Sequence, residues 1–152
     1  NNKAFLRHVT VNAIVIKNDQ ILLGKRGTLN GKPISESGKW DLLGGFFNHK
    51  ENLAQAVTRE VMEESGWEIN NLKLFRINDN PNRPHEDRQN VDIIIIANAV
   101  KQTGKSDEEV SHLQWFDLDK LPVKEEVAFD HRDAVELYKK YLKERFPLPV
   151  LG

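Results

Sequence analysis

Stretches in which hydrophobic and polar residues alternate mark the strands of this chain. The segment VTVNAIVIK at 9–17 alternates and is rich in β-branched residues, and QILLGKR at 20–26 follows it after two residues. Asn18 and Asp19 are turn-forming residues, so the two segments are predicted to form a β-hairpin. Further strands are predicted at 40–43, 72–77, 91–100 and 110–118. The stretch at 91–100, VDIIIIANAV, is the most apolar of them, which is typical of a central, buried strand.

Two segments carry the signals of helices. The first is predicted to begin after Asn52, because Asn52 and Gln55 fit the capping-box pattern, and to end at Gly66. The second is predicted over 131–144, with Asp130 as its N-cap. Polar loops are predicted at 27–39 and 78–90. Paired strands with two separated helices indicate a mixed sheet covered by helices.

The first helix carries a cluster of glutamates. At about 100° per residue, one side of it collects apolar residues that are expected to face the core, namely Leu53, Ala54, Val57 and Val61. Glu60, Glu63 and Glu64 fall on an arc that overlaps and flanks this apolar side. Like charges at such spacings repel by roughly 0.2–0.5 kcal/mol per pair. The glutamates either point to solvent, as in many glutamate-rich helices, or hold a hard divalent cation such as Mg²⁺. Their place beside the buried face favours the cation.

The composition narrows the classes of function. The chain has 152 residues, and 1–152 is predicted to fold as a single domain. Its net charge of −1 indicates neither a nucleic-acid partner nor an anionic membrane. The absence of cysteine excludes disulfides, a zinc–thiolate site and a cysteine nucleophile, and it fits a cytoplasmic protein. The longest apolar run, at 93–100, is too short to span a bilayer, so no membrane association is expected.

A more specific pattern runs from Gly45 to Trp67. The segment reads GFFNHKENLAQAVTREVMEESGW and resembles the Nudix box. Eight positions match that pattern at the required spacing: Gly45, Glu51, Arg59, Glu60, Val61, Glu63, Glu64 and Gly66. Two positions depart from it, since Trp67 stands where an aliphatic residue is usual and Leu43 where many members have proline. Neither change removes a ligand, and Trp67 is expected to pack into the core.

The resemblance to Nudix hydrolases extends over roughly residues 8–122. It implies the α/β/α sandwich of that family, with a mixed β-sheet between helices. It also implies hydrolysis of a nucleoside diphosphate linked to another moiety, with Mg²⁺ or Mn²⁺ as cofactor. The segments at 78–100 and 126–142 are similar to those of ADP-ribose pyrophosphatases. ADP-ribose or a related nucleotide is therefore the expected substrate.

The resemblance also implies a set of metal ligands. Glu60 and Glu64 are the expected direct ligands, and Glu63 is the next candidate. A main-chain oxygen of Gly44 or Gly45 is a further expected ligand, because glycines let the backbone approach a metal and a phosphate closely.

Two further residues of the box are expected to support these ligands. Glu51 is expected to coordinate a metal through water or to hold Arg59. Arg59 is expected to orient a carboxylate with its bidentate guanidinium. The alternative for Arg59 is a solvent-exposed pair with Glu63.

The general base is left open between residues in two segments. Glu60 is the candidate inside the box, and Glu108 and Glu109 are the candidates before the predicted strand at 110–118. Members of the family often use an acidic residue of that loop as an extra ligand or base, and Glu109 lies at the matching distance. The alternative is that Glu109 is a solvated loop glutamate.

The candidate substrate-binding residues are basic or aromatic and lie outside the box: Arg26, Arg83, Arg88 and Phe129. Arg26 ends a strand near the expected cleft, and Arg83 and Arg88 lie in a loop that would contact phosphate on closing. The alternatives are a charged strand end and an exposed, mobile loop. Phe129 and His131 are candidates to stack on a base or reach a phosphate. The favoured interpretation is a packed helix entry with an exposed histidine.

Two other functions fit the same box. One is a nucleoside triphosphate pyrophosphohydrolase of the house-cleaning type, and the other is a non-catalytic Nudix-like nucleotide-sensing domain. The intact box disfavours sensing. A small-molecule nucleotide is the expected partner, and no nucleic acid is expected because no strong basic patch appears. Similar proteins are often homodimers, so a homodimer is one of the open oligomeric states.

Overall fold

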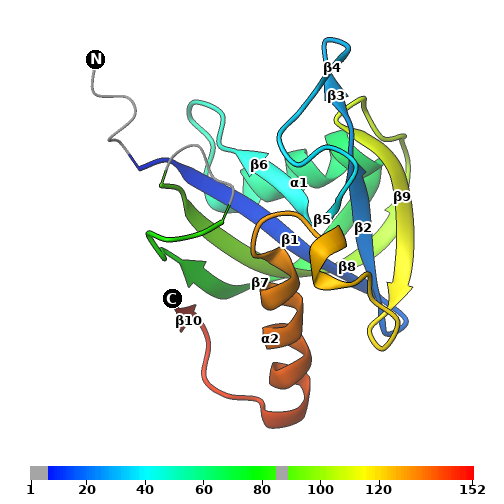
Figure 1. The fold of residues 1–152 in the computed structure, drawn as a ribbon. Coiled ribbons are helices and arrows are strands. Elements are labelled where there is room, and N and C mark those ends of the chain that lie inside the picture. Colours follow the sequence, from blue (N-terminus) through cyan, green and yellow to red (C-terminus); the bar gives the residue numbers. More distant parts are fainter. Residues whose placement is uncertain (1–6, 85–88) are drawn as a thin grey trace.

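The computed structural model describes residues 7–84 and 89–152. In these residues a mixed β-sheet runs through the middle of the molecule (Figure 1). Helix α1 (Leu53–Ser65) packs on one face of the sheet, and helix α2 (His131–Glu144) packs on the other. The strands of this sheet are β1 (Val9–Lys17), β2 (Gln20–Arg26), β5 (Trp40–Asp41), β6 (Leu43–Phe46), β7 (Trp67–Asn78), β8 (Val91–Gln102), β9 (Val110–Asp117) and β10 (Val150–Leu151). Outside it lie the hairpin of β3 (Thr28–Leu29) and β4 (Lys32–Pro33) and the 3₁₀ helix η2 (Lys124–Glu126). The three layers confirm the predicted α/β/α sandwich.

Strand β1 is the branch point of the sheet. Its residues 9–16 pair in parallel with β8 on one edge. On the other edge, residues 10–13 pair with β6 and residues 16–17 pair with β2, both antiparallel. Strand β2 also pairs with β9 and β5. Because β6 and β2 share one edge of β1, the sheet forks between them, and the functional cavity lies at this fork.

The alternation of side chains along β1 builds two cores. Val11, Ala13 and Val15 pack toward α1. Ile14 points the other way and packs in the cluster that contains Tyr138 of α2. Burial of each such apolar side chain contributes roughly 1.5–3 kcal/mol. The strand that separates the two helices is therefore anchored from both sides, which fixes the fork next to it.

Most predicted elements have the predicted bounds. Strands β1 and β2 coincide with the predicted hairpin. Helix α1 begins with the predicted capping box, in which the Gln55 amide donates to Asn52 Oδ1 at 2.9 Å and the Asn52 amide donates to Gln55 Oε1 at 3.0 Å. Gly66 ends the helix in the left-handed region, with φ of 74°. Trp67 packs against the α1 core and edge-to-face on Trp115, as expected. Strand β7 extends well beyond the predicted 72–77, and the predicted loop at 27–39 contains the β3–β4 hairpin.

Two expectations about the helices are wrong, and a third is confirmed only in part. Asp130 is the N-cap residue of α2 as predicted, but its side chain caps no amide there and binds Arg83 instead. Ala54 is exposed while Ala56 is buried, so the buried side of α1 is turned toward Glu60 and Glu64. His131 is only 4% exposed, because its ring lies among carboxylates rather than in solvent. Within the described residues, neither helix has the length and apolar character needed to cross a membrane.

Candidate active site

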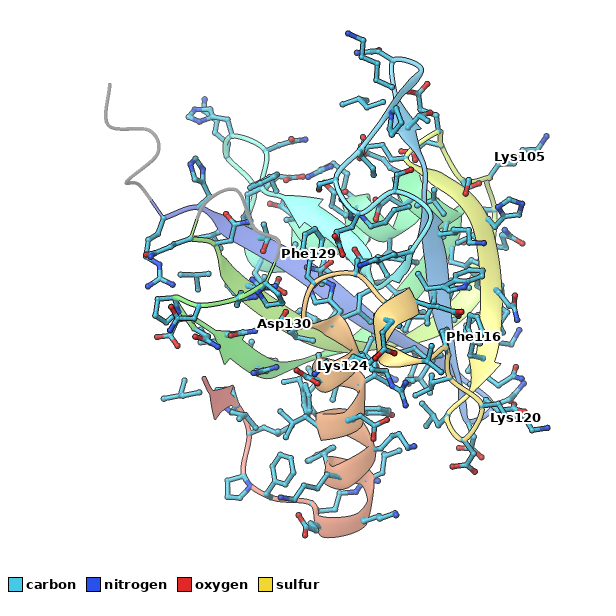
Figure 2. All side chains as sticks on the ribbon, in the orientation of Figure 1. Lys105, Phe116, Lys120, Lys124, Phe129 and Asp130 are labelled. Atoms are coloured by element: carbon cyan, nitrogen blue, oxygen red, sulfur yellow. The ribbon has the colours of Figure 1, made fainter. Side chains whose placement is uncertain are left out.

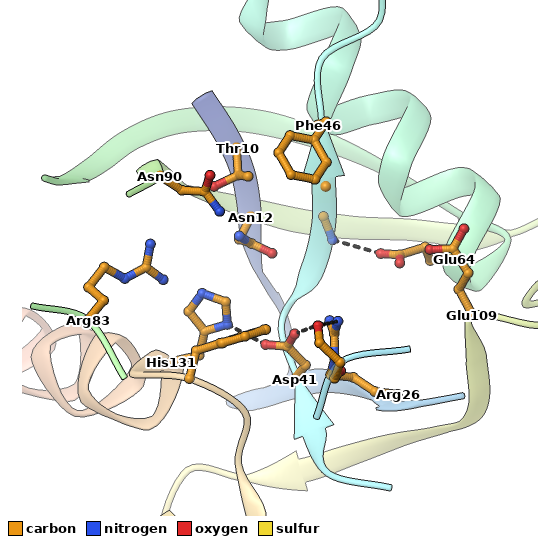
Figure 3. A pocket seen from close by; sticks show the side chains of 14 residues that line it. Thr10, Asn12, Arg26, Asp41, Phe46, Glu64, Arg83, Asn90, Glu109 and His131 are labelled. Carbon is orange, nitrogen blue, oxygen red and sulfur yellow. Dashed lines mark hydrogen bonds and ion pairs between the residues drawn. The ribbon is translucent and has the colours of Figure 1, made fainter. Parts of the chain in front are cut away.

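A cavity of about 310 Å³ lies at the fork of the sheet (Figure 3). Predicted site residues that line it are Arg26, Gly44, Gly45, Glu64, Arg83, Glu109 and Phe129. One side, here called the glutamate wall, consists of Gly44, Gly45 and Glu64, which line the cavity, and of Glu60 packed behind Gly45; it comes from β6 and α1. The other side, here called the ion-paired wall, consists of Arg26, Asp41, Arg83 and His131, which line the cavity, and of their partners Asp92 and Asp130. Strands of the sheet contribute to both walls, but α1 contributes only to the first and the start of α2 only to the second.

The glutamate wall is formed by α1 packing against β6. Glu64 Oε1 accepts a hydrogen bond from the Gly44 amide at 2.7 Å (Figure 3). A β-carbon on Gly45 would lie 2.9 Å from Glu60 Oε1, so the Glu60 carboxylate lies directly against Gly45. The Glu63 side chain is 52% exposed, whereas that of Glu60 is 14% exposed. Two of the three predicted ligands therefore face inward, and Glu63 lies at the solvent edge.

Arg59 connects the glutamates to one another. Its Nε and Nη2 donate to the two carboxylate oxygens of Glu51 at 2.6 and 3.0 Å, which is a bidentate pair. Its Nη1 donates to Glu60 at 2.9 Å and to Glu63 at 3.1 Å, and its Nη2 also donates to the Phe46 carbonyl at 3.0 Å. The guanidinium is thus fixed by contacts on several sides, and the pair with Glu63 is one contact among these.

The two inward glutamates have perturbed acidities. Burial raises the pKa of Glu64 well above its usual value, and the negative charge of Glu60 raises it further, although the Gly44 amide opposes the shift. Burial also raises the pKa of Glu60, with smaller contributions from Glu63 and Glu109 and an opposing effect of Arg59. The glutamate wall therefore holds buried carboxylates that lack enough positive charge around them.

This donor set fits a hard divalent cation. In residues 7–84 and 89–152 no three carboxylate or imidazole side chains are arranged to hold a metal ion, and Glu60 and Glu64 are bonded to Arg59 and to the Gly44 amide. The carboxylate oxygens of Glu60 and Glu64 are nevertheless of the type that Mg²⁺ and Mn²⁺ prefer. Their mutual repulsion is what such a cation would relieve. Gly44 and Gly45, whose main-chain oxygens are predicted ligands, line the same cavity.

Glu109 joins the cavity from the start of β9. Burial raises its pKa first, and the charges of Asp107 and Glu63 add to the shift while Arg26 opposes it. Its neighbour Glu108 accepts a hydrogen bond from the Gly31 amide at 3.3 Å and does not line the cavity. Of the two glutamates left open by the sequence, Glu109 is the one that the structure brings to the site.

The ion-paired wall is organised around His131. Its Nδ1 is hydrogen-bonded to Asp41, and its Nε2 is hydrogen-bonded to Asp92 Oδ2 at 2.9 Å. Burial alone would lower the pKa of His131, but the carboxylates of Asp41 and Asp92 outweigh it and raise the pKa to about 10. Thr10 and Asn12 donate to Asp92 Oδ1 at 2.9 and 2.8 Å. His131 is therefore a protonated, doubly bonded imidazolium at neutral pH.

Both arginines of this wall are paired with carboxylates. Arg26 Nη1 donates to Asp41 Oδ2 at 2.9 Å. Arg83 donates to both oxygens of Asp130, with its Nη2 at 2.9 Å from Oδ1 and its Nε at 3.0 Å from Oδ2. Arg83 Nη2 also lies 3.4 Å from Asp92 Oδ2. The three cations of the wall, counting protonated His131, thus match its three aspartates in number, and the wall carries no net formal charge.

The structure brings together most of the predicted site, but not all of it. Phe129 lies with its ring 5.0 Å from the Arg26 guanidinium carbon, at the entry to α2 (Figure 2). Phe129 has a positive φ of 53°, so the backbone turns sharply just before the helix. Arg88 lies outside the described residues. Glu51 is held by Arg59 rather than directed at the cavity.

Sequence reasoning missed the aspartates that form the ion-paired wall. Asp41 and Asp92 are each buried in a strand, at 4% and 0% exposure. A signal for both was present, because each is a charged residue inside an otherwise apolar stretch, WDLL and VDIIII. Buried aspartates need paired or hydrogen-bonding partners. That rule indicates a buried network, but it does not reveal that the partner would be His131.

Comparison with known families gives this site a context. A family model described as the NUDIX domain matches residues 6–138. The chain therefore belongs to the Nudix family, and its membership makes it an enzyme of the hydrolase class. The solved structure of a NUDIX hydrolase from Nitrosomonas europaea superposes with a TM-score of 0.75 at 25% identity, and covers 96% of this chain and 77% of that one. An ADP-ribose pyrophosphatase from Streptococcus suis superposes with a TM-score of 0.71 at 20% identity, over 97% of this chain and all of the other, which shows the shared fold.

Relatives with curated names differ in their substrates. The ADP-ribose pyrophosphatase of Methanocaldococcus jannaschii is 29% identical over 88% of this chain and 73% of its own length. The oxidized purine nucleoside triphosphate hydrolase of Danio rerio is 31% identical over 77% of this chain and 70% of its own. The NAD-capped RNA hydrolase NudC of Vibrio atlanticus is 29% identical over 81% of this chain, which spans only 42% of that protein. All three names describe hydrolases of nucleotides or of nucleotide-capped RNA.

Proposed function

We propose that the protein hydrolyses a nucleoside diphosphate linked to another moiety, with ADP-ribose as the best candidate, in a reaction that depends on a divalent metal. The observation that carries this proposal is the glutamate wall. Glu60 and Glu64 are largely buried near each other, burial raises the pKa of both, and the absence of a β-carbon on Gly45 lets the Glu60 carboxylate lie directly against β6 at the cavity. This arrangement suits a cation and the phosphates bound to it.

The residues of the wall would divide the chemistry among them. Glu60 and Glu64 would hold Mg²⁺ or Mn²⁺, with Glu63 contributing from the solvent edge. When bound, the metal neutralises the diphosphate and lowers the pKa of a coordinated water. Glu109, which lines the cavity and whose pKa is raised by burial, is the candidate to accept the proton of the attacking water. The water oxygen forms a bond to one phosphorus, and the bridging oxygen leaves with the other phosphate.

Arg59 would support this chemistry without acting in it. It already bonds Glu51, Glu60 and Glu63, so it fixes the directions of the carboxylates around the cation. Such orienting contacts are typically worth about 10- to 100-fold in metal affinity or activity.

The proposal of ADP-ribose rests on the relative from Methanocaldococcus jannaschii and on the sequence segments at 78–100 and 126–142. A nucleoside triphosphate is the second candidate, because the Danio rerio relative that acts on oxidized purine nucleoside triphosphates is 31% identical. The two reactions differ in their products. ADP-ribose gives AMP and ribose 5-phosphate, whereas a triphosphate gives a monophosphate and pyrophosphate.

A substrate panel tests the proposal. The protein would be incubated with Mg²⁺ and with ADP-ribose, NADH, sugar nucleotides, dinucleoside polyphosphates or nucleoside triphosphates, and the products separated by ion-exchange chromatography. Release of AMP from ADP-ribose that stops on addition of EDTA is the expected result. Pyrophosphate release from a triphosphate as the fastest reaction would replace ADP-ribose with the second candidate. Tight nucleotide binding without hydrolysis of any compound would indicate the sensing function instead.

A further inference from the structure

The ion-paired wall contains more charge than its stability requires. Its six ionisable groups are buried or half-buried and pair with one another. Replacing buried ion pairs of this kind with apolar residues often leaves a protein equally stable or more stable. Because the wall faces a cavity next to the glutamates, a role in the function of that cavity is the better explanation for its charges.

The contacts of the wall form a chain that crosses the sheet. Asp92 on β8 is bonded to His131 at the start of α2, and His131 is bonded to Asp41 on β5. Asp41 then bonds Arg26 at the end of β2 through its other oxygen. Each link joins a different structural element. His131 therefore ties the position of Asp41, and through it that of Arg26, to the central strand of the sheet.

Arg26 is the last member of this chain, and it lines the cavity together with Asp41 and His131. Its Nε donates to the Ser35 carbonyl at 2.6 Å, and its Nη1 donates to Asp41 at 2.9 Å. Its guanidinium lies on the Phe129 ring at 5.0 Å, a cation–π distance. Arg26 and Phe129 together form one continuous surface of the cavity. Two contacts connect this surface to the buried aspartates: the bond from Arg26 to Asp41, and the edge-to-face contact of the Phe129 ring with the His131 ring at 5.7 Å.

We propose that His131 is a positioning residue for nucleotide binding, which acts through Asp41 to hold Arg26 flat against Phe129. This inference rests on the function proposed above, since it takes the cavity as the nucleotide site. His131 also lines the cavity, but the role proposed here is to position this surface rather than to bind the nucleotide. Its role is to keep the Arg26–Phe129 surface in the geometry that the nucleotide contacts.

A protonated histidine suits this role for a simple chemical reason. An imidazolium donates hydrogen bonds from both of its nitrogens, so it satisfies Asp41 and Asp92 at the same time. A glutamine at the same place has a single amide donor group and places its carbonyl oxygen beside the other carboxylate. Asp41 or Asp92 would then lose its hydrogen bond from residue 131, and Asp41 would be held only by Arg26 and the Leu42 amide, so its position would be less firmly fixed.

A double-mutant cycle between His131 and Arg26 tests the proposal. The dissociation constant of ADP-ribose would be measured by calorimetry in EDTA for wild type, His131→Gln, Arg26→Met and the double variant. Each single change is expected to weaken binding by about tenfold, as for other residues that orient a binding group. The double variant is expected to bind about as weakly as Arg26→Met alone, because His131 acts through Arg26. Additive losses, near a hundredfold in the double variant, would overturn the proposal.

Two controls keep the cycle interpretable. His112→Gln removes an exposed histidine on β9 and is expected to leave the dissociation constant unchanged. Phe46→Ala alters an exposed ring at the other side of the cavity, and its effect is expected to add to that of His131→Gln. If His131→Gln does not fold, Asp41→Asn replaces it in the cycle. Asparagine has nearly the same shape as Asp41 but lacks the negative charge that binds His131 and Arg26. Additivity between Asp41→Asn and Arg26→Met would equally contradict the proposal.

Nitrogen-15 spectra of the imidazole give a second, independent readout. Both ring nitrogens of His131 are expected to carry protons at pH 8, and a neutral tautomer at that pH would overturn the proposal. The binding cycle is also separate from catalysis. If the protein hydrolyses ADP-ribose but the binding losses are additive, the proposed role of His131 is wrong and the proposed function stands. If the binding losses are coupled but no hydrolysis occurs, the role of His131 in binding stands and the proposed function is wrong. If wild type does not bind ADP-ribose in EDTA, the KM for ADP-ribose is measured instead for the same four proteins and tested for the same coupling. Absence of both binding and hydrolysis contradicts both proposals.

Discussion

In the glutamate wall, Glu60 and Glu64 are buried beside other carboxylates, and burial raises the pKa of both. In the ion-paired wall, Asp92 is buried at 0% exposure, yet its pKa is lowered, because the opposing contacts with His131 and Arg83 outweigh its burial. The depth of burial is therefore not what separates the two sides of the cavity. The ion-paired wall has one cation for each of its aspartates, whereas the glutamate wall has only Arg59, which is shared among Glu51, Glu60 and Glu63, and this is why the glutamate wall suits an added cation.

The comparison also changes what Arg26 and Arg83 are expected to do. A free guanidinium in a cleft would attract phosphate, but each of these is already paired with a carboxylate. The ion-paired wall is neutral overall, so it suits an uncharged part of a nucleotide better than a diphosphate. The expected phosphate contacts of Arg26 and Arg83 remain predictions, and the metal proposed for the glutamate wall makes that wall the better candidate for binding the phosphates.

The substitution Glu64→Gln is expected to have the largest effect. It keeps an acceptor for the Gly44 amide but removes a buried charge that a metal would bind. We expect kcat with Mg²⁺ to fall by about 10²–10⁴-fold, since the metal supplies several kcal/mol of transition-state stabilisation. In EDTA the variant is expected to unfold at the same temperature as wild type or higher, because a buried charge is removed.

Glu63→Gln is the matched control for that experiment, because the Glu63 side chain is mostly exposed on the same helix. Its loss of kcat is expected to be smaller than that of Glu64→Gln. Mg²⁺ is expected to raise the melting temperature of wild type and of Glu63→Gln more than that of Glu64→Gln. Near-normal turnover by Glu64→Gln would show that the metal is not bound at the glutamate wall.

The two glycines of the wall are expected to respond differently to alanine. A β-carbon at Gly44 would lie 2.0 Å from the Val11 carbonyl oxygen, a backbone atom, so Gly44→Ala is expected to destabilise the fold by more than about 2 kcal/mol. At Gly45 the nearest atoms belong to the movable carboxylate of Glu60. Gly45→Ala is expected to fold normally and to lose about tenfold or more in kcat/KM, because Glu60 is displaced.

Urea unfolding and initial rates, measured on both variants, separate these outcomes. If Gly45→Ala is fully active, Glu60 does not need its position against β6. If Gly44→Ala is as stable as wild type, the close packing of β6 on β1 is not required for the fold.

These residues also show how far the sequence could lead. The glutamate wall was predictable, because Glu60 and Glu64 are four residues apart in a single helix and therefore lie on the same side of it. The ends of this helix are also marked in the sequence by the capping residues Asn52 and Gly66. The ion-paired wall was not predictable, because its members are distant in sequence. Asp41 and His131 are 90 residues apart and meet only through the packing of α2 on the sheet.

Local signals even misled at one position on this side of the molecule. Asp130 has the residue type and the place of an N-cap, but a bidentate pair with Arg83 takes its carboxylate instead. A charge-assisted pair of this kind is stronger than a single capping bond to an amide. Tertiary partners, which the sequence pattern does not show, therefore decided the role of Asp130 and also the burial of His131.

The pH dependence of stability offers a direct test of the difference between the walls. For Glu64 the pKa in the folded protein is raised, so the folded state gains stability from protonated Glu64 below its usual pKa of 4.5 and loses that gain as the pH rises. For His131 the pKa is raised from 6.5 to about 10, so the folded state keeps the benefit of the charged ring below pH 6.5 and loses it as the pH approaches 10.

At neutral pH in EDTA the two groups should therefore act in opposite directions. Glu64→Gln is expected to be at least as stable as wild type, and its advantage should grow between pH 5 and neutrality as the wild-type carboxyl is forced to ionise. His131→Gln is expected to be less stable than wild type, by a margin that shrinks above pH 7. Urea denaturation of the three proteins at several pH values gives these differences, and equal pH slopes for all three would refute the distinction.

The smallest effect on activity is expected from removing the N-cap of α1. This substitution tests whether the activity depends on the stability of the helix or only on the charges of the glutamate wall. Asn52→Ala removes the acceptor for the Gln55 amide, which is expected to cost about 1 kcal/mol in urea unfolding. Glu60 and Glu64 lie in the second half of the helix, two turns or more from the cap, and are held by Arg59 and Gly44. We therefore expect kcat and KM to stay within about twofold of wild type, since the loss of one cap is spread over the whole helix. A large fall in kcat would show that fraying at the start of α1 reaches the glutamates, and that the wall depends on the rigidity of the helix as well as on its charges.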